Sequence, residues 1–329
     1  MTLPSFAVAI PVHNKERHAV RALRSVLAQT ARAAEIIIVD DASTDGSIAA
    51  MQSVAAPRPG VTYLSRAEPG PGGYAARNLA IENTSSDWIA FLDADDSWEV
   101  DHLARFGDAI RQAGPDAGCV FAGYTFLEPE HFTMTDWFTR SGRKAGVYRS
   151  GDMLDAWIAG GCPLWTGAVA IRRQLLLDLK GFPAGLARRG GDRDLWLRTM
   201  IATDCIYTGR ITANYHRDAD NMLTRAESFS VRQRVQDTVL EQLPRVDSPT
   251  ADRLRRISNR EVFQYALKAW KGGAPITEPM LRDFSIRATP GKYALIQAMK
   301  AVPLPFGQDI RGRIRMLRTA LRKRRFAGS

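Results

Sequence analysis

Short apolar runs alternate with amphipathic stretches along the first two-thirds of the chain. Most of these runs do not alternate between apolar and polar residues, which predicts strands covered on both faces. Between the runs, apolar residues recur at helical spacing, as Val20, Leu23 and Leu27 do after the first run. The predicted strands are Phe6–Pro11, Glu35–Asp40, Val61–Ser65, Trp88–Leu92, Cys119–Tyr124 and Ala168–Ile171. This order predicts an α/β fold with a doubly wound, mostly parallel sheet flanked by helices.

Acidic residues directly follow two of the predicted strands. Asp93, Asp95 and Asp96 follow the fourth strand, and Asp40 and Asp41 stand at the end of the second. Ligands of doubly wound sheets bind outside the carboxyl ends of the strands, so both groups are expected at one edge. A cluster of three acids is stable if it stays solvated, is capped or meets a cation. A divalent ion held by one or two carboxylates and by substrate phosphates matches such a cluster.

The same acidic stretch is also consistent with an ordinary turn. In that interpretation, Asp96 or Ser97 caps a helix that begins near Trp98. Acidic turns at helix starts are common, so this stretch alone leaves both interpretations open.

The loop Gly70–Gly73 precedes a predicted helix, Tyr74–Glu82. Its sequence fits neither the dinucleotide fingerprint nor the P-loop, and Pro71 removes a backbone donor that a phosphate cradle would use. Arg77, one turn inside the helix, is placed to reach an anion near the helix N-terminus, or to be an exposed surface residue.

Two further candidates lie later in the chain. Asp192 follows two glycines at a predicted helix start, as either an N-cap or a carboxylate directed into the cleft. His216 follows a predicted edge strand ending at Tyr215, and is either a ligand of a metal or diphosphate or a packing histidine.

The net charge of +10 comes from the C-terminal third. Residues 1–225 hold 24 Lys and Arg against 26 Asp and Glu, whereas residues 226–329 hold 21 against 9. We therefore predict two parts, an α/β domain (1–225) and a helical, basic C-terminal region (226–329). The stretch Asp309–Phe326 combines an apolar stripe with many arginines, which is typical of an interfacial helix at an anionic membrane surface or of a helix packed on the body.

Nucleic-acid binding by this basic stretch is not expected, because it lacks a recognised module and interleaved aromatic residues. The three cysteines are far apart in sequence, and no cleavable signal precedes the first strand. We therefore expect a cytoplasmic protein, peripheral on the inner face of the membrane if the basic helix binds lipid.

Taken together, these motifs resemble family 2 glycosyltransferases of the GT-A fold. The resemblance covers residues 5–222 and rests on five motifs in the family's order and spacing. They are Val8–Asn14, Glu35–Ser47, Ala76–Ala80, Phe91–Asp96 and Gly191–Arg198. Any one of them is weak, but the five in sequence favour the site interpretation of the acidic cluster.

The resemblance implies a nucleotide-diphosphate sugar donor, with UDP the usual nucleotide. The backbone at Pro11 and Val12 would line the base pocket, and Asp41 would accept a hydrogen bond from the base. Arg77 would lie near the base or diphosphate, and Asp93 would face the ribose.

By the same resemblance, Asp95 would bind Mg²⁺ or Mn²⁺, with His216 as a further ligand of the metal or diphosphate. Asp192 would be the general base that activates the acceptor hydroxyl for one inverting displacement. The family often has Glu-Asp here, whereas Gly191 stands in the Glu position of this chain. Asp194 is then a helix residue or a reserve candidate for the base.

The motif of processive members is absent, which favours transfer of one sugar to a glycan or lipid-linked acceptor. Acceptor choice is expected in Phe126–Val147 and around Trp165. Two alternatives stay open. One is a nucleotide-sugar-binding protein without turnover, motivated by Gly191. The other, ranked lower, is a nucleotidyltransferase, which would need a Gly-rich triphosphate loop with a basic residue near the first strand.

Overall fold

The computed structural model describes residues 4–55, 59–128, 133–218 and 232–302. The chain divides into two compact units, Met1–Arg225 and Ala226–Ser329. The predicted basic helix, 309–326, lies outside the described residues, as do 129–132 of the predicted acceptor segment.

The first unit is built around one mixed sheet in the order β3-β2-β1-β4-β9-β6-β10-β5, with β7 beside β6 and β8 beside β10. The strands β3, β2, β1 and β4 pair in parallel, as do β6 and β10, whereas β9 runs antiparallel to both of its neighbours. The strands are β1 (Phe6–Val12), β2 (Glu35–Asp40), β3 (Val61–Ser65), β4 (Trp88–Phe91), β5 (Ser97–Trp98), β6 (Cys119–Leu127), β7 (Thr133–Thr135), β8 (Gly146–Tyr148), β9 (Val169–Arg172) and β10 (Cys205–His216).

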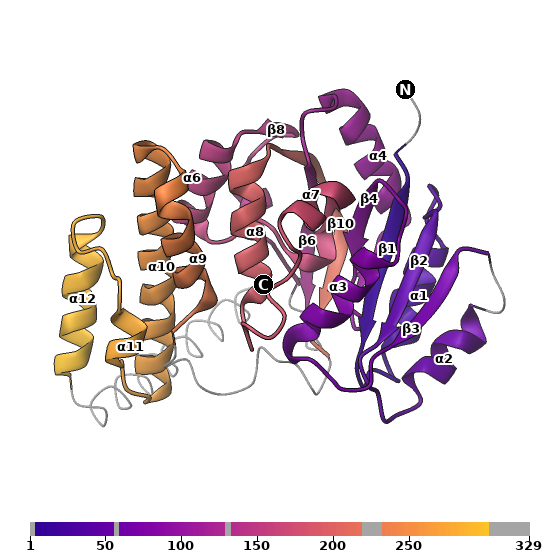
Figure 1. Ribbon diagram of the computed structural model, residues 1–329, viewed down its shortest axis with the longest axis horizontal. Helices are drawn as coiled ribbons and strands as arrows, with labels where there is room; N and C mark the ends of the chain where they lie inside the picture. Colours follow the sequence, from indigo (N-terminus) through magenta and orange to yellow (C-terminus); the bar gives the residue numbers. More distant parts are fainter. Residues whose placement is uncertain (1–3, 56–58, 129–132, 219–231, 303–329) are drawn as a thin grey trace, which may run out of the picture. The chain divides into compact units, whose positions relative to one another are not determined.

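Helices cover both faces of this sheet (Figure 1). One face packs on α1, α2 and α4, where Leu23, Met51 and Phe106 meet the apolar side chains of β1, β2 and β4. The other face carries α3, α7 and α8, and there Phe91 of β4 contacts Phe182 and Trp196. The helices of this unit are α1 (Ala19–Leu27), α2 (Ser47–Val54), α3 (Tyr74–Glu82), α4 (His102–Ala113), α5 (Trp137–Arg140), α6 (Ser150–Gly160), α7 (Arg173–Asp178) and α8 (Gly191–Ala202). The predicted α/β class is confirmed.

The helix predicted to begin near Trp98 begins instead at His102. Ser97 and Trp98 form a short strand against Asn214 and Ala213 of β10. The Trp98 indole N–H donates to the Gly167 carbonyl at 2.7 Å, a contact distant in sequence. Neither Asp96 nor Ser97 therefore caps a helix at this point, and the capping interpretation of the acidic stretch is wrong.

His102 is fully buried at the start of α4 between the rings of Trp98 and Phe106. Its Nδ1 lies 2.7 Å from Thr212 Oγ1, while Nε2 is buried without a hydrogen-bond partner. Burial lowers the pKa of this imidazole to about 3, so it packs as a neutral ring.

This histidine predicts a loss of stability in acid. Below the ordinary histidine pKa of 6.5, the unfolded chain binds a proton at His102 that the folded chain does not bind. The free energy of unfolding should therefore fall as the pH drops toward 3, by about 1.4 kcal/mol per pH unit from this group. His102→Gln cannot titrate and should flatten the dependence by that amount. Denaturant unfolding at about pH 7 and about pH 5 measures both chains, and an equal acid loss in the variant would contradict the assignment.

The second unit is helical in its described part. It contains α9 (Arg234–Gln242), α10 (Ser248–Gly272), α11 (Glu278–Leu281) and α12 (Pro290–Ala301). Val262 and Ala266 of α10 pack with Met280 and Ile296 in a small core of its own. None of the helices described in either unit is long and apolar enough to cross a membrane.

Candidate active site

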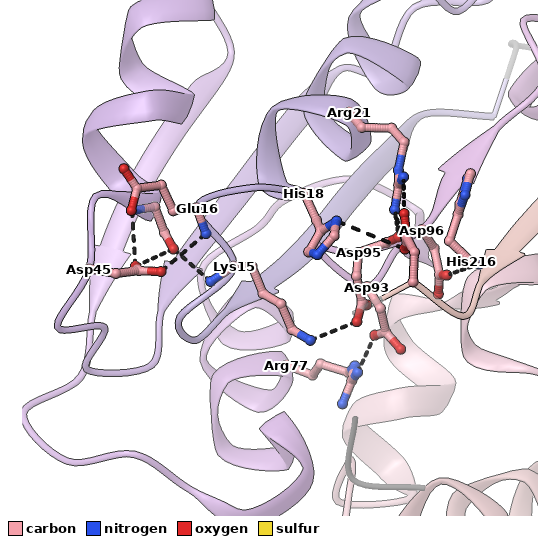
Figure 2. Close-up of polar contacts among 12 residues, drawn as sticks. Lys15, Glu16, His18, Arg21, Asp45, Arg77, Asp93, Asp95, Asp96 and His216 are labelled. Carbon is pink, nitrogen blue, oxygen red and sulfur yellow. Dashed lines mark hydrogen bonds and ion pairs between the residues drawn. The ribbon is translucent and has the colours of Figure 1, made fainter. Parts of the chain in front are cut away.

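The loop after β4 places three carboxylates at the carboxyl edge of the sheet (Figure 2). Lys15, from the loop after β1, donates to Asp95 with its Nζ 2.7 Å from Oδ2. Arg77 of α3 pairs with Asp93. Arg21 of α1 donates to the Asp95 main-chain carbonyl at 2.6 Å. Cations from three neighbouring elements therefore converge on this loop.

Asp96 is the buried member of the three carboxylates. One oxygen accepts the His216 amide hydrogen at 2.9 Å, and the other is buried without a hydrogen-bond partner. Burial and the neighbouring Asp95 and Asp93 raise the pKa of Asp96 well above its ordinary value. Burial therefore favours the neutral form of the Asp96 carboxyl group.

His216 ends β10 beside this loop. Its Nε2 lies 2.9 Å from Ser97 Oγ. Burial and Arg21 lower the pKa of the imidazole to about 4, so the ring is neutral. His216 therefore lies beside the acidic loop, as the sequence predicts for a candidate ligand. One of its ring nitrogens is hydrogen-bonded to Ser97.

No group of three or more His, Cys, Asp or Glu side chains within the described residues is arranged to hold a metal by itself. The donor set nevertheless fits a hard divalent ion of the Mg²⁺ type, which commonly binds one or two carboxylates and completes its shell with water and substrate phosphates. Asp95 is partly exposed, at 14% of its side chain, and the unpartnered Asp96 oxygen lies in the same loop.

Asp41 occupies the neighbouring position, at the end of β2. Its side chain is 2% exposed in the fold, and it pairs with Arg66 and accepts the Gly70 amide hydrogen at 3.1 Å. Its own amide donates to the Val12 carbonyl at 2.7 Å. Pro11 lies beside Gly73 of the Gly-rich loop. The residues predicted to surround a base therefore do lie together.

Arg77 is buried and contacts both the acidic loop and the Gly-rich loop. Besides Asp93, it donates to the Gly72 carbonyl at 2.7 Å, and its guanidinium lies 5.4 Å from the centre of the Phe182 ring. The exposed-surface interpretation of Arg77 is therefore wrong.

Asp192 lies in the first turn of α8, where backbone N–H groups and the helix dipole favour a negative charge. It is half-buried. Asp194 differs, because it is fully buried and paired with Arg198, which also donates to the Gly181 carbonyl at 2.8 Å. Asp194 therefore anchors the helix to the preceding loop.

Sequence reasoning missed four residues of this edge: Lys15, Arg21, Arg66 and Tyr74. Each contacts a predicted residue that lies distant in the sequence. Lys15 carried a signal, since it lies in the loop directly after the first strand. The others had none, because their partners become neighbours only when the sheet forms.

The fold and the acidic edge define an α/β protein with a polar site at the carboxyl ends of its parallel strands. Residues 7–175, more than half of the chain, match the model of glycosyl transferase family 2. The chain belongs to this family.

The chain is also similar to curated proteins. An uncharacterized protein of Mycobacterium tuberculosis is 30% identical over 230 residues, which cover 66% of this chain and 68% of that protein. The succinoglycan biosynthesis protein ExoO of Rhizobium meliloti is 36% identical over 112 residues, 34% of this chain and 31% of ExoO. The chain spans less than a third of the length of the first curated relatives it matches.

Solved structures share the fold. Staphylococcus aureus TarS 1–349 in complex with UDP superposes with a TM-score of 0.70 at 16% identity, over 95% of this chain and 91% of that chain. The same TarS fragment with UDP-GlcNAc gives 0.69 at 14% identity, over 93% and 87%. The predicted GT-A fold is confirmed by these likenesses.

Proposed function

We propose that the protein is an inverting glycosyltransferase that moves one sugar from a nucleotide-diphosphate sugar, with UDP the expected nucleotide, to a hydroxyl of a glycan or lipid-linked acceptor. The observation that carries the proposal is the convergence of Asp41, the Arg77–Asp93 pair and Asp95 at one sheet edge. Family membership and the fold shared with TarS, which was crystallised with UDP and UDP-GlcNAc, support it.

Each residue has a task in this proposal. Asp41 accepts a hydrogen bond from the base in a pocket walled by Pro11 and Val12, and Arg66 fixes the carboxylate that does so. Asp93 faces the ribose and is oriented by the buried Arg77. Lys15 and Arg21 hold the acidic loop in place through Asp95.

Asp95 is proposed to hold Mg²⁺ or Mn²⁺, with His216 beside it. When bound, the ion would neutralise charge on the departing diphosphate, so that the leaving group needs no protonation. The buried Asp96 oxygen without a hydrogen-bond partner, in the same loop as Asp95, supports a cation here.

Asp192 is proposed to remove the proton from the acceptor hydroxyl as that oxygen attacks the anomeric carbon. Its half-exposed position at the N-terminus of α8 keeps the carboxylate accessible to an acceptor. One displacement of this kind inverts the configuration.

A cluster of half-buried aromatic rings supports a sugar as the acceptor. Tyr124 and Trp165 lie 4.4 Å apart between ring centres, and Tyr215 contacts both Trp165 and Phe126 at 5.1 and 5.4 Å. Tyr215 directly precedes His216 of the acidic edge, so the cluster adjoins that edge. Flat rings offer apolar contact area with a polar handle, which suits the faces of a pyranose.

Donor consumption tests the proposal. The full-length chain is incubated with a panel of UDP-, GDP- and dTDP-sugars, glycan and lipid-linked acceptors, and Mn²⁺, Mg²⁺ or a chelator. We expect one donor to be consumed, with an inverted product, and only when metal is present. Nucleotide binding without turnover on any acceptor would contradict the proposal and favour a binding protein.

A further inference from the structure

Two sequence features remain without a role in the proposed function: the loop Gly70–Gly73 and the glycine at position 191. Both contact the same side chain, Tyr74, the first residue of α3. Tyr74 is 5% exposed. Its ring and its hydroxyl make separate contacts, which together account for both features.

The glycines of the loop direct the ring. Gly72 and Gly73 have φ values of +71° and +64°, a backbone region that favours glycine. A Cβ at Gly72 would also collide with the Tyr74 ring, so the ring lies directly over the loop. This loop therefore turns the chain and leaves room for the Tyr74 ring.

The Tyr74 hydroxyl accepts hydrogen bonds from backbone N–H groups at the N-terminus of α8, which have no partner within the helix. Its oxygen accepts the Gly191 amide hydrogen at 2.8 Å and also that of Asp192. The N-cap residue of α8 is Gly190, which has no side chain to do this. Burial and the nearby Asp192 raise the pKa of Tyr74 to about 12, so the hydroxyl stays neutral. Tyr74 therefore caps, from another helix, the turn that carries Asp192.

Position 191 leaves room for this contact only as glycine. A Cβ there would lie 2.8 Å from two carbons of the Tyr74 ring and 2.9 Å from Pro183 Cγ. Such approaches are too close for any side chain unless Tyr74 moves. Glycine in place of the family's glutamate is thus a condition for the Tyr74 contact with α8.

The ring also reaches the donor side of the site. Tyr74 stacks on Phe182 at 6.1 Å with an angle of 12° between the planes. Phe182 in turn lies beneath the guanidinium of Arg77, the partner of Asp93. One side chain therefore connects the residues assigned to the donor with the helix turn assigned to the base.

We propose that Tyr74 is a positioning residue that fixes the first turn of α8, and with it Asp192, relative to the donor-binding edge. This inference rests on the proposed function for its catalytic consequence. Its structural part, the cap on α8, can be measured without any activity.

Tyr74→Phe tests the proposal, since it removes the hydroxyl and keeps the ring on Phe182. Misplacing a catalytic group by about 1 Å costs on the order of 100-fold in rate. We expect kcat to fall by about that factor, with the donor KM and nucleotide affinity unchanged. Tyr63→Phe is the matched control, because the Tyr63 hydroxyl is buried on β3 without a hydrogen-bond partner. The control should retain wild-type kcat.

Two further measurements separate positioning from general destabilisation. In an Asp192→Asn background, Tyr74→Phe should cause no additional loss of kcat, whereas losses that multiply would overturn the proposal. Amide hydrogen exchange at Gly191 and Asp192 should accelerate in Tyr74→Phe and not in Tyr63→Phe. Unchanged exchange, or a kcat equal to that of the control, would also overturn it. If the wild-type chain shows no sugar transfer, the proposed function is refuted instead. Amide hydrogen exchange would then still test whether Tyr74 caps α8.

Discussion

Asp192→Asn should lower kcat for sugar transfer on the order of 10³-fold and leave nucleotide affinity within about twofold of the wild type, since a positioned general base contributes about 10² to 10⁴. The amide cannot accept the acceptor proton, yet it has nearly the same size and keeps its place in the first turn of α8. Steady-state kinetics with the donor found in the panel, together with nucleotide titration calorimetry, measure the two quantities.

Asp194→Asn is the matched control for this prediction. Asp194 lies two residues further along the same helix, but it is buried and paired with Arg198. Breaking a buried pair destabilises by about 3 to 5 kcal/mol, so we expect a lower melting temperature and nearly unchanged kcat in the protein that remains folded. The opposite pattern, with transfer lost at Asp194 and retained at Asp192, would move the general base to Asp194.

Much of the fold could be predicted from the sequence because parallel strands covered on both faces are continuous apolar runs. The predicted bounds of β2, β3 and α3 agree with the structure residue for residue. The segment after β4 was harder, because its structure depends on distant partners. The local pattern predicts Trp98 at the start of a helix, yet its indole hydrogen bond to Gly167 holds it in β5.

In the candidate site, too, some residues can be predicted from local sequence, whereas others depend on distant partners. Asp41, Asp93 and Asp95 are found from the rule that ligands bind at the carboxyl ends of strands. Their counterions are not found this way, because Arg66 is 25 residues from Asp41 and Lys15 is 80 residues from Asp95. A single sequence contains no periodic signal for such pairs.

The contact between Tyr74 and Gly191 is an extreme case, because its partners are 117 positions apart in the sequence. In the sequence, Gly191 stands where the resembled family often has a glutamate, which motivates the alternative of a binding protein without turnover. In the structure, the absence of a side chain at Gly191 leaves the room that the Tyr74 ring occupies. The departure from the family pattern therefore argues less strongly for an inactive protein than the sequence suggests.

Asp95→Ala is the second change with a large expected effect. If Asp95 holds the divalent ion, its loss should lower kcat/KM on the order of 10³-fold and abolish the difference between metal and chelator, because a metal at a departing phosphate supplies several kcal/mol of charge stabilisation. The variant should still fold, since Asp95 is a partly exposed loop residue whose side chain pairs with Lys15. Donor consumption across Mn²⁺ concentrations, with thermal unfolding as the fold check, measures this.

Asp108→Ala is the control, because it removes an exposed carboxylate of α4 whose partner is Arg111. It should leave metal dependence and rate unchanged. The structure also defines the contrary outcome. Lys15 already places a positive charge 2.7 Å from Asp95 Oδ2, and a lysine can itself neutralise phosphate charge. If wild-type transfer persists in chelator and is lost in Lys15→Met, the cation of this site is the lysine, and Asp95 serves to orient it.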